Sequence, residues 1–172
     1  MSLKLRPADG KPYQPSRIQE DMTELSLNEA ALRASQCYSQ GRLAEAESIY
    51  RKILDVVPEH PDITHMLGVI CARTNRLVEA QALMTRAVEL SPQCARFHNS
   101  LGDFLLSIGK TGQAIARFQE ALKLAPDNAE AQCRLGDLLC GQMRFAEAEA
   151  CFRKVLQLKP DHVNACHNLA SI

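Results

Sequence analysis

The chain has 172 residues, 46% of them hydrophobic, which is enough apolar material for a folded core. Its 20 basic and 20 acidic residues cancel without long runs of one sign, which argues against nucleic acid or an anionic membrane surface as the partner. Seven cysteines without a Cys-x-x-Cys pair favour reduced thiols, and no signal core or membrane-spanning run is present, so we expect a cytoplasmic protein.

The N-terminal part of the chain is predicted to have two segments. Residues 1–15 contain three prolines and a glycine and are expected to form a flexible leader. Residues 16–26 form a short amphipathic capping helix in which Ile18, Met22 and Leu25 follow helical spacing. This helix either covers the array that follows or lies in its groove as an internal ligand. The capping-box sequence from Ser26 to Glu29 then predicts that the array begins at about residue 27.

The rest of the chain repeats with a period of 34 residues. Three residue types return at this interval: prolines at 58, 92, 126 and 160, alanines at 46, 80, 114 and 148, and leucines at 67, 101, 135 and 169. Each period contains two stretches with helical spacing of apolar residues. The pattern predicts an all-α chain of tandem helix-turn-helix repeats at 27–60, 61–94, 95–128 and 129–162, with a half repeat at 163–172.

The turns carry their own signals. Gly41, Asn75 and Gly109 occupy the slot between the two helices of a repeat and suit a positive φ, whereas Met143 in that slot predicts a less regular turn. The proline ends the second helix, and Asp127 or Asn128 is expected to cap the next one.

Glycines and aromatic residues predict how the helices of a repeat pack. The small residues Gly102 and Ala114 are expected to face each other where the two helices cross, with Phe118 filling the gap.

These repeats resemble the tetratricopeptide repeat (TPR) family. The stretch "AEAQCRLGDLLCGQMRFAEAEACFRKVLQLKPD", from Ala129 to Asp161, is similar to the family motif. The resemblance implies a right-handed α-solenoid, a TPR-like superhelix, whose first helices line a concave groove that binds a peptide or a partner protein.

Several short motifs contain residue types that are found in phosphate-binding loops or in reactive-thiol sites. The "GKTG" stretch at Gly109 is not a phosphate loop, because position 104 is Phe and the lead-in is helical; we expect a turn capped by Thr111. Cys37 and Cys71 occupy a leucine slot and are expected in the core. Cys94, in a turn, is the expected reactive thiol.

No metal site or catalytic site is predicted. His65, Cys133 and His167 share one slot of successive repeats, but stacked helices are about 8 to 10 Å apart, too far for one zinc ion. No nucleophile has a base arranged beside it. We therefore expect no cofactor, no metal and no enzymatic activity.

The resemblance places the binding residues in rows along the first helices. The predicted groove residues are His65, Met66, Val69, Arg96, Asn99, Asp103, Arg134, Asp137, His167 and Asn168. One end is apolar and takes a hydrophobic side chain, and the other is polar and binds an extended backbone or an acidic group. In the alternative interpretation the arginines and Asp103 or Asp137 form salt bridges on a solvated face.

The predicted function is a protein-interaction module that binds a protein or peptide, without nucleic acid or membrane. Two alternatives stay open: the N-terminal, substrate-recruiting region of a larger glycosyltransferase-like or sulfotransferase-like enzyme, and a scaffold that self-associates through its terminal repeats. The final stretch "HVNACHNLASI" is either a one-helix lid or the point where a longer array was cut. The apolar edge at Leu169 and Ile172 favours the cut.

Overall fold

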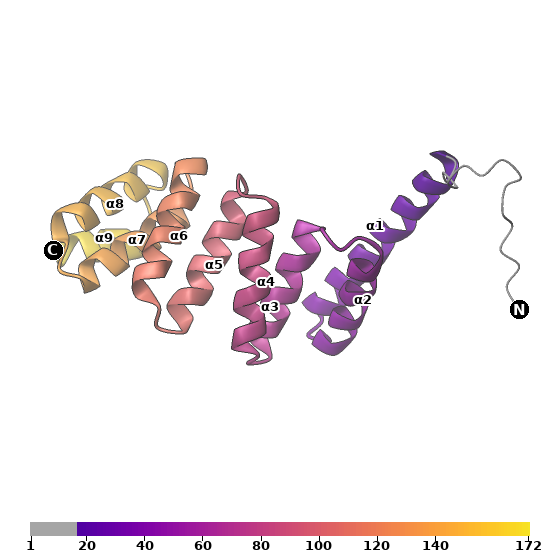
Figure 1. Ribbon diagram of the computed structural model, residues 1–172. Coiled ribbons are helices and arrows are strands. Elements are labelled where there is room, and N and C mark those ends of the chain that lie inside the picture. Colours follow the sequence, from indigo (N-terminus) through magenta and orange to yellow (C-terminus); the bar gives the residue numbers. More distant parts are fainter. Residues whose placement is uncertain (1–16) are drawn as a thin grey trace, which may run out of the picture. The chain divides into compact units, whose positions relative to one another are not determined.

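The computed structural model describes the backbone of residues 17–172 and the side chains from residue 26 onward. This part of the chain forms nine helices and no strand, which confirms the all-α class (Figure 1). The helices are α1 (Arg17–Ser39), α2 (Leu43–Val56), α3 (Pro61–Arg73), α4 (Leu77–Leu90), α5 (Ala95–Ser107), α6 (Thr111–Leu124), α7 (Ala129–Gly141), α8 (Phe145–Leu158) and α9 (Val163–Ala170).

The chain divides into two compact units. The first unit ends at Val56 and holds α1 and α2, which pack on each other. The second unit begins at Val57 and holds α3 to α9, in which each helix packs on the next one in the chain and α7 also contacts α9. Packing between neighbours in sequence is the defining property of a repeat solenoid.

The first unit differs from the prediction at its start. Helix α1 runs through residue 27 without a break, so the capping box at Ser26 does not begin a helix. Further along α1, Ala34 and Cys37 are fully buried, and the Ser35 hydroxyl lies 3.0 Å from the hydroxyl of buried Tyr50. The predicted leader and the side chains of Ile18, Met22 and Leu25 lie outside the described residues, so their roles stay predictions.

Glycines set the approach of paired helices in the second unit. A Cβ atom built on Gly102 would lie 3.0 Å from the Phe118 ring, and one on Gly136 would lie 2.7 Å from the Phe152 ring. Both rings are fully buried. The prediction that the paired helices approach closely at Gly102 is confirmed, and the residue that lies against this glycine is Phe118: the absent side chain makes room for its ring.

The turns inside the repeats share one backbone geometry. Gly41, Gly109 and Asn75 have φ values of 77°, 76° and 61°, as predicted. Met143 has φ 59°, so the prediction of a less regular fourth turn is wrong. The hydrogen bonds of the turn explain this: Arg144 N donates to Leu139 O at 2.9 Å, and the same bond closes the other turns. The repeated geometry thus overrides the preference of methionine for negative φ.

Side-chain caps begin α3, α7 and α9, whereas α5 begins after Cys94 without one. Asn128, not Asp127, caps α7, because its side-chain oxygen accepts from Ala131 N at 3.1 Å. His60 and His162 cap α3 and α9 through their Nδ1 atoms. The cap predicted at Thr111 is wrong: α6 begins there, and Lys110 precedes it without a side-chain cap.

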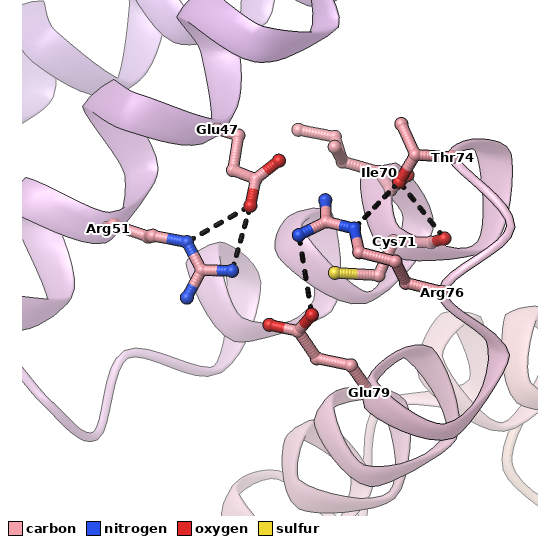
Figure 2. A network of polar contacts seen from close by, with 7 residues as sticks. All are labelled: Glu47, Arg51, Ile70, Cys71, Thr74, Arg76 and Glu79. Atoms are coloured by element: carbon pink, nitrogen blue, oxygen red, sulfur yellow. Dashed lines mark hydrogen bonds and ion pairs between the residues drawn. The ribbon is translucent and has the colours of Figure 1, made fainter.

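Polar pairs tie the start of the second helix to its turn in three of the four repeats. In α4, Arg76 lies 3.3 Å from Glu79 and donates to the Thr74 hydroxyl at 3.0 Å, and that hydroxyl in turn donates to Ile70 O at 2.9 Å (Figure 2). Figure 2 also draws a pair within α2, in which Arg51 lies 2.8 Å from Glu47. These contacts fix local geometry and contribute about 0 to 1 kcal/mol each.

Candidate functional site

The candidate site is the row of polar side chains that the first helices α3, α5, α7 and α9 carry in the second unit. The ten predicted groove residues differ in exposure. Exposed are Arg96, Arg134, Asp137 and His167; half-buried are Met66, Val69, Asn99, Asp103 and Asn168; His65 is buried. The row therefore presents mainly charged and amide groups.

Contacts between successive repeats join this row. Arg96 forms an ion pair with Asp62, one repeat earlier. Arg134 Nε lies 3.5 Å from Asp103 Oδ1, and Asn168 Nδ2 donates to Asp137 Oδ1 at 2.6 Å. Exposed pairs of this kind contribute about 0 to 1 kcal/mol, so they order the face more than they stabilise the fold.

For Asp103 and Asp137, the nearby arginine and amide groups do not fully offset the cost of burying the carboxylate charge. Burial raises the pKa of Asp103, and the nearby charge of Arg134 only partly opposes this. Burial also raises the pKa of Asp137, against the hydrogen bond from Asn168. Since desolvation outweighs the favourable contacts, both carboxylates gain from any further donor that approaches them.

His65 lies beneath the row rather than on it. Its side chain is 6% exposed, and its ring lies 5.0 Å from the ring of Phe97, centroid to centroid. Neither ring nitrogen has a hydrogen-bond partner. Burial, and then the charge of Arg96, lower the pKa of His65 to about 4, so the ring is neutral at physiological pH.

Two further features lie along the row. The side-chain oxygen of Asn99 is buried without a hydrogen-bond partner, which is costly unless a donor reaches it. A hollow of about 330 Å³ lies between α7 and α9. Its lining residues are Glu130, Cys133, Arg134, Asp137, Lys159, His162 and Asn164. Lys159 and His162 were not predicted, because they lie in the turn between repeats and the predicted rows followed the helices alone.

The cysteines are distributed differently from the prediction in one respect. Cys37 and Cys71 are buried, as predicted from their leucine slot. Cys94 is only half-exposed, at the start of α5, whereas Cys166 on α9 is exposed. Cys166 therefore replaces Cys94 as the expected reactive thiol.

The described part of the chain also bears on metal binding and on membrane insertion. There, no three His, Cys, Asp or Glu side chains are grouped so as to hold a metal ion. None of the helices from Arg17 to Ala170 combines the length and apolar character that crossing a membrane requires.

Comparison with protein families yields a match over most of the chain. The family model for the tetratricopeptide repeat matches residues 38–103 and 105–172. No curated protein matches the sequence.

Solved structures resemble the chain along most of its length. The structure described as YrrB, "a TPR protein with an unusual peptide-binding site", is 20% identical, with a TM-score of 0.74 over 91% of this chain and 81% of that one. MamA from Desulfovibrio magneticus is 18% identical, with a TM-score of 0.75 over 84% and 82%. A tetratricopeptide repeat protein from Parabacteroides merdae is 22% identical, with a TM-score of 0.77 over 85% and 58%. At these identities the likeness shows the fold alone.

Proposed function

This chain belongs to the tetratricopeptide repeat family, and we propose that it is a non-catalytic interaction module whose first-helix row binds an extended segment of a partner protein. The row runs along α3, α5, α7 and α9, and it includes the hollow between α7 and α9. The buried, unpartnered oxygen of Asn99 carries the proposal, because a backbone N–H of an extended segment is the donor that would satisfy it.

Charges along the row support the same ligand. Arg96 and Arg134 remain more than 40% exposed despite their ion pairs, so each can donate to a second partner. Asp103 and Asp137 gain from additional donors, because burial raises the pKa of each. A polypeptide backbone alternates donors and acceptors, which suits a row that offers both. The known peptide-binding site of the similar YrrB structure points in the same direction.

Selection from a library of random peptides tests this proposal. Peptides that bind the immobilised wild-type protein are synthesised with a fluorescent label, and their affinity is measured by polarisation. We expect Arg134→Gln and Asn168→Ala to weaken binding about tenfold, the loss of one charge-assisted or buried hydrogen bond.

The matched control is Arg153→Gln on α8. Arg153 is also an exposed arginine in an ion pair, 2.6 Å from Glu149, but it lies on a second helix. Selected peptides that bind Arg134→Gln and Asn168→Ala as tightly as wild type would refute the proposal. Loss of binding in Arg153→Gln alone would have the same meaning.

A further inference from the structure

A second hollow is lined by none of the ten predicted groove residues. It has a volume of about 440 Å³ and is lined by residues of α4, α5 and α6, all in the second unit. Leu101 and Leu105 of α5 lie at its apolar side, and Gln81 of α4 and Arg117 of α6 are among its polar residues. It shares no residue with the hollow between α7 and α9.

The hollow lies where the second helices of successive repeats, α4 and α6, meet, and the corresponding junction of α6 and α8 shows why the hollow exists. One repeat later, the equivalents of Gln81 and Arg117 are Ile115 and Cys151. Both are 6% exposed and belong to the hydrophobic core, so apolar side chains close that junction. At the α4 and α6 junction the polar Gln81 and Arg117 are only partly buried, and a space remains.

A second departure from the repeat pattern occurs at the same place. Elsewhere an arginine before the second helix pairs with a glutamate three residues later: Arg42 with Glu45, Arg76 with Glu79 and Arg144 with Glu147. The third repeat has Lys110 and Gln113 instead. Lys110 Nζ donates to Gln81 Oε1 at 2.7 Å, and Gln113 lines the hollow. The missing glutamate removes a negative charge from its rim.

The rim is consequently cationic. Within the described residues, neither Lys110 nor Arg117 forms a salt bridge to a carboxylate. Glu89, also beside the hollow, lies 3.5 Å from Arg86 and is engaged there. Glu120 lies near enough for the charge of Arg117 to act on it, but its ion pair is with Lys123. A half-buried guanidinium without an ion-paired carboxylate, next to an apolar floor, favours a carboxylate that arrives together with an apolar group.

We propose that this hollow is a second docking site, which takes an acidic and aliphatic segment of a partner protein. An aliphatic side chain of that segment packs on Leu101 and Leu105, and the carboxylate of a neighbouring Asp or Glu pairs with Arg117. Lys110 and Gln113 supply the remaining donors at the rim. The site and the first-helix row share α5 but no lining residue, so one chain can hold two segments at once.

Nuclear magnetic resonance titration with small blocked peptides tests the site directly. The probes are acetyl-Leu-Glu-amide and its uncharged counterpart acetyl-Leu-Gln-amide, added at millimolar concentration to ¹⁵N-labelled protein. We expect the glutamate probe to shift the amide signals around Leu105 and Arg117. Its binding should weaken about tenfold in Arg117→Gln. The glutamine probe should bind wild type no better than the glutamate probe binds Arg117→Gln.

Two more variants separate shape from charge. Gln81→Ile introduces the residue that the next repeat uses to close its junction, so it should fold and abolish the shifts around Leu105. Arg153→Gln, with an exposed arginine on α8, should behave as wild type. The proposal is overturned if the glutamate probe shifts only signals of α7 and α9. It is also overturned if Arg117→Gln or Gln81→Ile binds that probe as tightly as wild type does, or if the two probes bind wild type equally. The affinity of the selected peptides for the first-helix row is measured separately, so the failure of this second site would leave that proposal standing.

Discussion

The imidazole of His65 packs on the ring of Phe97 with the centroids 5.0 Å apart and with no hydrogen bond to either nitrogen. This arrangement holds the ring neutral, because a charge there would be both desolvated and close to Arg96. The nearby Asp62 acts in the opposite direction, but more weakly.

The buried His65 predicts a loss of stability in mild acid. Its pKa is about 4 in the folded chain, below the ordinary 6.5, so the unfolded chain binds more protons between these values. The contribution of His65 is present above pH 6.5 and is lost as the pH falls toward 4, roughly 2 kcal/mol by pH 5. Urea unfolding at pH 7 and pH 5 measures it. In His65→Leu this part of the pH dependence should vanish, and an equal dependence in both proteins would contradict the assignment.

Gly136→Ala should destabilise the second unit. The new methyl would lie 2.7 Å from the buried ring of Phe152, and overpacking of about 1–3 kcal/mol outweighs the helix propensity gain of at most about 1 kcal/mol. Gly112→Ala is the control, because a Cβ there meets nothing within 4 Å. It should leave the unfolding free energy unchanged or slightly higher. Equal effects of the two substitutions would mean that Phe152 moves aside without cost.

Met143→Gly should stabilise the protein by about 1 kcal/mol. Met143 has φ 59° and is 76% exposed, so glycine removes backbone strain and loses few contacts. Asn75→Gly, at the same place in the second repeat, should change little, because asparagine tolerates this conformation. Thermal unfolding compares the two variants. A lower melting temperature for Met143→Gly would show that entropy of the unfolded chain dominates at this position.

Thiol labelling should show one fast phase. Cys166 is exposed, whereas burial raises the pKa of the Cys133, Cys140 and Cys151 thiols and so disfavours their reactive thiolates. A chromogenic disulfide reagent under native conditions measures the rates, and Cys166→Ser should remove the fast phase. A fast phase that persists in this variant and disappears in Cys94→Ser would restore the original expectation for Cys94.

Periodicity predicted the repeats well, because a residue that returns every 34 positions must serve the same contact each time. The close approach of the paired helices at Gly102, the burial of Cys37 and Cys71 and a cap at either Asp127 or Asn128 all followed from it. It failed where a local preference opposed the shared geometry. Methionine disfavours positive φ and Ser26 favours a helix start, yet the turn at Met143 is regular and α1 is continuous.

The candidate site was less predictable for a different reason. A row assignment gives the direction of a side chain but not its depth, so the burial of His65 beneath Phe97 and Arg96 was not foreseen. The hollow beside Arg117 was not predicted, because it lies where the third repeat departs from the pattern that the other repeats share. The signal was present in the sequence: Lys110 and Gln113 replace an arginine and a glutamate that the other repeats keep.

The packing of each helix mainly on its neighbours along the chain has a consequence for local opening. Because the main contacts of the second unit are local in sequence, segments can open without disrupting the whole unit. Helix α9 has eight residues and packs mainly on α8, with a smaller contact to α7. Its amide hydrogens should exchange with deuterated water much faster than those of α5, which is held between α4 and α6. A ligand bound between α7 and α9 would slow that exchange, so occupancy of this end could be followed without any label.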